Sequence, residues 1–243
     1  MKLMSKVVDA GIVAAFAAIV LAGSSAALAA AAGSVMYLSG TLSVKKADGS
    51  VRILSQKSEI QNGDTLSTER ESYAQVRFAD GAQMTMKPNA SVKVEDIKFA
   101  EDKPEEDFFV FRLLKGGLRH VTGLVGKRSR DKVGVTTTTA TIGIRGTTFS
   151  VDDCVRADGR DECANLEPGV YLSVADGQII VRNDAGEEVY SVGQFGLIQE
   201  GKRPAFLPAD PGLKFDPPAT FRSAVTERDA AVNAGKDLEC VVR

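Results

Sequence analysis

The stretch Gly143–Gly146 holds an arginine between two glycines, a pattern that can serve a phosphate-binding loop. Such a loop needs several backbone N–H groups that converge beside a helix N-terminus. Here Thr147, Phe149 and Val151 follow instead, and these residues favour a strand. The next two residues are aspartates, which would repel a phosphate. Because the formal net charge is also −2, the sequence predicts no nucleotide or nucleic-acid partner.

The single histidine, His120, is the one candidate for a Ser-His-Asp triad. It lies in a stretch expected to be a strand, beside Arg119, and we expect it to be half-exposed. The chain has no G-x-S-x-G elbow to supply an activated serine. The paired carboxylates Asp152-Asp153 and Glu105-Glu106 are assigned to loops as solvated charge. The sequence therefore predicts no catalytic residues and no enzyme activity.

Three cysteines are present, and two of them flank a short polar segment. Cys154 and Cys163 enclose a turn centred on Asp158-Gly159, which can bring the two thiols together. In an oxidising compartment they are predicted to form a disulfide, worth roughly 2.5–3 kcal/mol by the chain-entropy model. Two free thiols are the alternative. Cys240 is left over, either free or paired with another molecule.

An acidic cluster surrounds this proposed disulfide. It contains Asp152, Asp153, Asp158, Asp161 and Glu162. Hard oxygen ligands suit calcium, but the spacing matches no known calcium loop and arginines interleave with the carboxylates. A zinc site would need more cysteine or histidine nearby. The sequence therefore predicts neither a metal ion nor a cofactor.

The first thirty residues differ in composition from the rest of the chain. Lys2 and Lys6 precede an apolar stretch at 11–22, and small residues with A-x-A sites follow it. This order is typical of a secretory signal, predicted here as residues 1–29 with cleavage at 29–32. The apolar stretch is shorter than the roughly 20 residues of a spanning helix. The chain is expected to be periplasmic or secreted, with no stable membrane insertion after cleavage; an uncleaved N-terminal anchor is the alternative.

After this segment, the sequence pattern predicts short strands separated by turns. Three A-D-G turns predict hairpins: 41–46 with 50–54, 74–79 with 82–87, and 170–175 with 178–183. The alternation is clearest around Asp80-Gly81, where apolar and polar residues take turns on both sides. The predicted fold is mainly β, a sandwich or β-roll of short antiparallel strands. Residues 201–243 are expected to form an extended, proline-rich tail that ends in one short C-terminal helix.

The signature stretch, "ATIGIRGTTFSV" at 140–151, resembles the signature of the FecR domain. This domain is the periplasmic β module of ferric-citrate-type regulators. The segments "NGDTLSTERESYAQVRFADGAQMTMKPNASVKV" at 62–94 and "LLKGGLRHVTG" at 113–123, read as a strand pair, resemble other parts of that domain in the same order. The resemblance covers about residues 33–200. It implies that Gly143, Arg145, Gly146, Thr147 and Phe149 form a structural corner of the module, where Gly146 bends the chain.

The resemblance also implies a partner. Regulators of this family carry a cytoplasmic arm for a sigma factor, a membrane span and a periplasmic domain that engages an outer-membrane receptor. Only about ten residues precede the apolar segment here, so we expect an exported form without that arm. The first hypothesis is thus an interaction or sensory module that binds a protein partner in envelope signalling or assembly. The alternative is a structural or carbohydrate-binding envelope protein, although four scattered tyrosines and no tryptophan offer little aromatic surface for a sugar.

Overall fold

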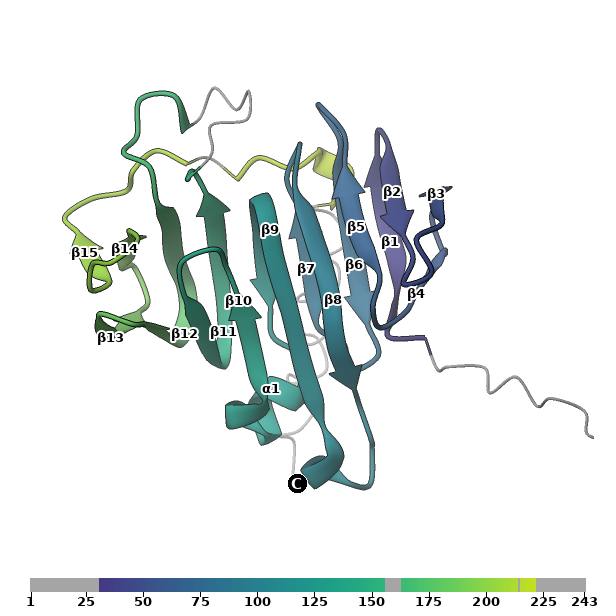
Figure 1. The fold of residues 1–243 in the computed structure, drawn as a ribbon. Helices are drawn as coiled ribbons and strands as arrows, with labels where there is room; N and C mark the ends of the chain where they lie inside the picture. The colour runs from purple at the N-terminus through teal and green to yellow at the C-terminus, as the bar shows by residue number, and fades with distance from the viewer. Residues whose placement is uncertain (1–30, 156–162, 214, 222–243) are drawn as a thin grey trace, which may run out of the picture. The chain divides into compact units, whose positions relative to one another are not determined.

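The structure is a computed structural model that describes residues 31–155, 163–213 and 215–221. Within these residues the chain forms one mixed sheet of fifteen strands (Figure 1), so the predicted mainly-β fold is confirmed. The predicted signal peptide, Asp158, Asp161, Glu162 and Cys240 lie outside the described residues. No helix in the described part of the chain is long and apolar enough to cross a membrane.

The strands of the first half follow one another with short turns. They are β1 (Gly33–Ser39), β2 (Leu42–Lys45), β3 (Val51–Leu54), β4 (Glu59–Ile60), β5 (Thr65–Thr68), β6 (Tyr73–Phe78), β7 (Gln83–Met86), β8 (Ser91–Lys98) and β9 (Phe108–Val121). Two predicted hairpins are present: β2 pairs with β3 around the turn at 46–50, and β6 pairs with β7 around Asp80-Gly81. Both turns contain a glycine with positive φ, as a D-G turn requires.

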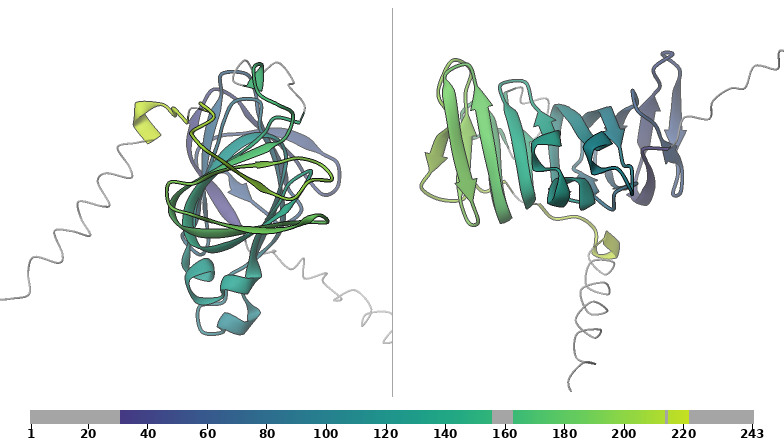
Figure 2. Two further views of the ribbon diagram at one scale, coloured as in Figure 1. Left: turned by 90° about the vertical axis from the view of Figure 1, so that its left-hand side faces the viewer. Right: turned by 90° about the horizontal axis from the view of Figure 1, so that it is seen from below.

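The second half contains the remaining strands and the short helices. They are η1 (Pro104–Glu106), α1 (Leu124–Arg128), η2 (Arg130–Lys132), β10 (Val133–Thr136), β11 (Thr141–Asp153), β12 (Val170–Asn183), β13 (Gly186–Ser191), β14 (Phe195–Ile198) and β15 (Ala205–Leu207). The three short helices lie together beyond the ends of the strands (Figure 2). The Ser129 hydroxyl and the Lys132 ammonium donate hydrogen bonds to the backbone carbonyls of Pro104 and Glu105, and these bonds link η1 to the two ends of η2.

The third predicted hairpin, 170–175 with 178–183, is wrong. These residues form the single strand β12, which pairs antiparallel with β11 on both sides of its A-D-G sequence. The pairing register shifts at this point, so Gly177 sits in a bulge and not in a reversal of the chain. The predicted strand pair at 113–123 is likewise one strand, β9.

The three long strands β9, β11 and β12 change partners along their length. Residues 108–115 of β9 pair with β8, and 109–112 also pair parallel with β10. From Gly116 onward β9 pairs antiparallel with β11, and from Leu118 also with β7. In β12 the first half pairs with β14 and the second half with β13. Partner exchange of this kind joins all the strands into one sheet around a continuous core.

The core is apolar and includes an inward row from the signature stretch. Ile142, Ile144, Phe149 and Val151 of β11 are all fully buried. The inward-facing residues have even numbers before the bend and odd numbers after it. Because side chains along a strand alternate with a period of two, this change requires one extra residue in the strand at the bend. The other large buried side chains include Leu42, Ile60, Leu66, Met84, Met86, Phe109, Phe111 and Leu118.

The described part of the predicted tail lies across the β structure. After β15 pairs with β14, Leu213 packs near Tyr171, and the Arg119 guanidinium lies 5.5 Å from the centre of the Phe215 ring. Phe221 is buried with its ring 5.8 Å from that of Tyr37. Residues 219–221 are helical, and the rest of the predicted C-terminal helix lies outside the described residues.

Candidate functional site

The signature stretch contains a bend at which β11 and β12 bulge together. The β11–β12 register shifts between Arg145 and Thr148. Gly146 has a φ of 67°, and Gly177 on the facing strand has a φ of 73°. Both values lie in the left-handed region that glycine adopts without strain. The paired bulges keep both strands in contact while each shifts its inward row by one residue.

Thr122, the residue that follows β9, holds this bend in place. Its hydroxyl donates a hydrogen bond to the Thr147 carbonyl oxygen at 2.8 Å and accepts one from the Thr147 N–H at 3.0 Å. The Thr122 N–H donates to the same carbonyl oxygen at 3.0 Å. The sequence did not predict this role for Thr122, because a threonine that follows a strand carries no special signal by itself.

The residues of the predicted corner are divided between two faces of the sheet. Thr147 and Phe149 are buried, whereas Arg145 is exposed and Gly143 is half-exposed on the opposite face. The purely structural role given to all five residues therefore stays a prediction. Gly143 and Arg145 therefore belong to the outer surface of the sheet.

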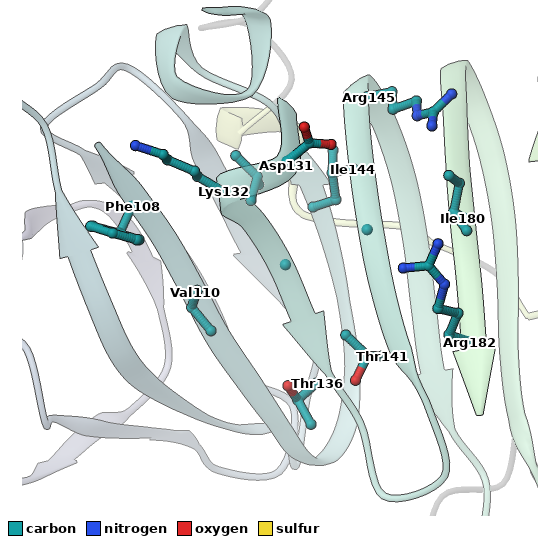
Figure 3. A pocket seen from close by; sticks show the side chains of 13 residues that line it. Phe108, Val110, Asp131, Lys132, Thr136, Thr141, Ile144, Arg145, Ile180 and Arg182 are labelled. Carbon is teal, nitrogen blue, oxygen red and sulfur yellow. The ribbon is translucent and has the colours of Figure 1, made fainter. Parts of the chain in front are cut away.

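That surface is hollowed into a groove of about 590 Å³, called the outer groove below (Figure 3). It is lined by Phe108, Val110, Asp131, Lys132, Val133, Gly134, Thr136, Thr141, Gly143, Ile144, Arg145, Ile180 and Arg182. Figure 3 shows Arg145, Ile180 and Arg182 along one side, with Phe108, Val110 and Lys132 along the other. The lining comes from β9, η2, β10, β11 and β12, so it exists only when these strands are assembled.

The floor of the outer groove is one cross-strand row of small or apolar residues. Val110 pairs with Gly134, Gly134 with Gly143, and Gly143 with Ile180. A Cβ on Gly134 would meet only the Ile142 carbonyl oxygen at 3.9 Å, and one on Gly143 only the Ile180 carbonyl oxygen at 3.8 Å. Neither has a positive φ. Packing and backbone geometry thus leave room for a side chain at both positions.

Cationic side chains surround this floor. The Arg145 side chain is exposed and makes no hydrogen bond or ion pair with any described residue, while its backbone pairs with Gln178 of β12. Arg182 pairs with Glu187 on β13, and Lys132 lies over the Phe108 ring at 5.1 Å. One carboxylate, Asp131, also lines the groove. The alternation of residues along β10 and β11 predicts that Gly134, Thr136 and Thr141 point outward. The sequence does not show that these residues lie together in one groove.

His120 is not half-exposed as predicted; it is completely buried. Its ring lies 5.3, 5.4 and 5.7 Å from the rings of Phe109, Phe111 and Phe149. Neither ring nitrogen has a hydrogen-bond partner among the described residues. Burial lowers the pKa of His120 to about 3, because the charged form cannot be solvated there. The inward position on β9 gives this side chain no route to a substrate at the surface.

Asp152 and Asp153 are not loop residues as predicted; both are buried at the end of β11. Lys87 Nζ, also buried, lies 2.9 Å from Asp152 Oδ1. Asp153 accepts hydrogen bonds from the Thr138 hydroxyl and the Val155 N–H, both at 3.0 Å. Tyr171 and three residues of the tail, Asp210, Pro211 and Leu213, line a small hollow with Asp152. These carboxylates are therefore tied to neighbouring strands rather than to solvent.

Cys154 and Cys163 form the predicted disulfide, with their Cα atoms 5.6 Å apart. They belong to a small apolar cluster with Tyr171, against which Leu207 and Leu213 of the tail pack. Within the described residues no group of three or more histidine, cysteine or acidic side chains is arranged to hold a metal ion.

Comparison with known proteins gives one family and a few distant structural likenesses. Two crystal structures described as a candidate anti-sigma factor from Parabacteroides distasonis ATCC 8503 match with TM-scores of 0.44 at 16% and 15% identity. Each match covers 60% of this chain and 60% of that protein. A cell surface anchoring domain matches with a TM-score of 0.25 at 25% identity, over 26% of this chain and 83% of that domain. At such scores none of these likenesses assigns a function.

No match was found among curated proteins. The family model described as FecR protein matches residues 64–179, from the start of β5 to the second half of β12. This range contains the signature stretch and most of the outer groove. It is narrower than the predicted 33–200, although β1 and β13–β15 belong to the same sheet. The chain therefore carries a FecR domain.

Proposed function

We propose that this chain is an exported, non-catalytic signalling module that binds a protein partner through the outer groove. The observation that carries the proposal is the exposed Arg145 side chain, which makes no hydrogen bond or ion pair with a described residue and lies beside the open floor at Gly134 and Gly143. A FecR domain supports a regulator-like module. The groove spans five elements on one side of the β structure, which suits a protein surface better than a small substrate.

The Cys154–Cys163 disulfide supports export, because such bonds persist in oxidising compartments. Together with the predicted signal at 1–29, it supports a partner in the periplasm or at the cell envelope. The module acts there as an interaction or sensory domain. It requires no cofactor, and its partner is a protein and not a nucleic acid.

The carbohydrate-binding alternative needs exposed aromatic rings, and the tyrosines do not provide them. Tyr171 and Tyr190 are buried, and Tyr37 and Tyr73 are half-buried, with the Tyr37 ring packed near Phe221. The Tyr190 hydroxyl donates a hydrogen bond to the Ala205 carbonyl oxygen at 3.0 Å, which fixes this side chain within the fold. Since no observation favours it, this alternative is not proposed.

Site-specific photo-crosslinking in the producing cells tests the proposed function. A photoreactive residue at Thr141, exposed in the outer groove, should join one defined protein in the envelope fraction. The same residue at Ser50, exposed in the turn between β2 and β3, is the control and should not. Equal labelling at both positions, or labelling at neither, would contradict the proposal. N-terminal sequencing of the same material tests export; a retained Met1 would contradict cleavage.

A further inference from the structure

We infer that the outer groove receives an acidic, extended segment of its partner, in which two carboxylates four residues apart flank an apolar side chain. The inference rests on the proposed function and names the chemistry of the partner. It follows from the order of residues along β11 and β12, from the two glycines of the floor and from the charges at the ends of the groove.

The spacing follows from the strand register. Arg145, Gly143 and Thr141 alternate outward on β11, and Arg182 pairs with Thr141 on the neighbouring strand. Arg145 and Arg182 thus mark two rows that are four residues apart along the strands, about 13 Å at the usual rise per residue. An extended segment laid along β11 repeats this spacing, because its side chains i, i+2 and i+4 point to the same face. Carboxylates at i and i+4 then meet the two arginines.

The middle side chain of this segment would lie over the glycine floor. Gly134 and Gly143 are direct cross-strand neighbours, and Val110 and Ile180 flank them in the same row. A glycine inside a strand weakens it and marks a place where another backbone approaches closely. Neither the φ angles nor the surrounding atoms require glycine here. Because these two glycines have no side chain, they leave a shallow depression between Val110 and Ile180, which an apolar side chain at i+2 would fill.

The charges select an acidic occupant. Arg145 is exposed and has no acceptor among the described residues, so an incoming carboxylate gains a charge-assisted hydrogen bond without breaking another. Arg182 keeps donors beyond the one it gives to Glu187 through Nε, because a guanidinium carries five. Lys132 adds positive charge on the opposite side, near Phe108. Asp131 is the one opposing charge in the lining, and it lies beside Lys132 in sequence.

The test uses a fluorescent peptide with the core Glu-Thr-Val-Thr-Glu and the mature full chain, with anisotropy as the readout. A peptide with the core Gln-Thr-Val-Thr-Gln should bind at least tenfold more weakly. Arg145→Glu should weaken binding of the acidic peptide at least tenfold. Arg52→Glu on β3, an exposed arginine away from the groove, is the matched control and should change it less than twofold. Added salt should weaken binding of the acidic peptide.

A second variant separates binding from folding. Gly143→Ala should leave the melting temperature unchanged or raise it, because the site has room for a Cβ, yet it should weaken peptide binding at least threefold. Gly134→Ala should behave in the same way. A peptide that shows no binding at millimolar concentration, equal binding of the acidic and neutral peptides, or full binding by Gly143→Ala would each overturn the inference.

The outcomes also separate this inference from the proposed function. If a partner crosslinks at Thr141 and its affinity is unchanged by Arg145→Glu, the groove is the binding surface but its occupant is not acidic, and this inference fails alone. If no partner crosslinks there, the proposed function fails. If sedimentation shows a dimer that Arg145→Glu dissociates, the occupant is a second copy of this chain and the acidic-partner inference is overturned.

Discussion

Gly177 on β12 lies against the backbone of Gly146 on β11, and a Cβ on Gly177 would come 2.4 Å from the Gly146 carbonyl oxygen. Gly146 itself faces open space: no atom lies within 4 Å of the position of its Cβ. The two glycines therefore serve the same bend for different reasons. Gly177 is required by both its positive φ and the close backbone contact, whereas Gly146 is required by its φ alone.

This difference orders the effects of substitution at the bend. Gly146→Ala should cost about 1–2 kcal/mol from the left-handed backbone, and Gly177→Ala should cost more, because a steric clash adds to the strain. Arg145→Ala should stay within about 0.5 kcal/mol of the parent. Urea unfolding measures all three. Gly146→Asn is the control, since asparagine tolerates this conformation and should be milder than alanine. A Gly177→Ala protein as stable as Gly146→Ala would refute the close contact.

Thr122→Val should destabilise the protein by about 1–3 kcal/mol, because it leaves the buried Thr147 N–H without its acceptor at 3.0 Å. The substitution keeps the shape of the side chain and removes only its hydroxyl. Thr141→Val, on the exposed part of β11, is the matched control and should change stability little. The melting temperatures of both variants, measured by thermal unfolding, test this prediction. Equal melting temperatures would show that the hydroxyl does not hold the bend.

The burial of the His120 imidazole predicts that the stability of the protein depends on pH. Its pKa falls from 6.5 to about 3 on folding, so the unfolded state binds a proton first as the pH is lowered. The His120 contribution should be constant above pH 6.5 and should fall by about 1.4 kcal/mol per unit between pH 6.5 and 3.

The variant His120→Leu isolates this contribution from that of the carboxylates. The parent should lose stability faster than His120→Leu as the pH falls from 6.5, and the difference between their unfolding free energies gives the share of the histidine. At pH 7 the variant should be at least as stable, because it removes two buried nitrogens that have no partner among the described residues. Parallel pH profiles would contradict the burial of a neutral imidazole.

Lys87→Met should destabilise the protein by about 3–5 kcal/mol, because it removes the buried ammonium that lies 2.9 Å from the buried Asp152 carboxylate. The double variant Lys87→Met/Asp152→Leu should recover much of this loss. Lys98→Met, which breaks the exposed pair with Glu106, is the control and should cost at most about 1 kcal/mol. Chemical denaturation measures the set. A double variant no more stable than Lys87→Met would argue against a simple buried pair.

Loss of the disulfide should lower stability by roughly 2.5–3 kcal/mol on the chain-entropy model. The double variant Cys154→Ser/Cys163→Ser should also loosen the tail, since Leu207 and Leu213 pack against the disulfide cluster. Hydrogen exchange should then speed up in residues 205–213 more than in β6–β7. Non-reducing peptide mapping of the parent checks the bond; a Cys154–Cys240 link would contradict it.

The sequence by itself determined the features that depend on neighbours along the chain. The A-D-G turns at 47–49 and 79–81 are each flanked by short alternating segments, and both became hairpins. The alternation of residues on either side of Gly146 indicates the inward row of Ile142, Ile144, Phe149 and Val151. The cysteine spacing likewise indicated the bond between Cys154 and Cys163, because a short polar loop brings its ends together.

The tertiary structure alone decided the features that depend on residues distant in sequence. The A-D-G at 175–177 has the local pattern of a turn, but β11 lies alongside with a matching bulge at Gly146 and pairs with both halves of β12. His120 is buried because strand β9 turns that side toward three phenylalanines. The outer groove arises where β9, β10, β11 and β12 align Gly134 with Gly143. Alternation shows that a residue points outward, but only the register of the assembled strands determines which outward residues meet.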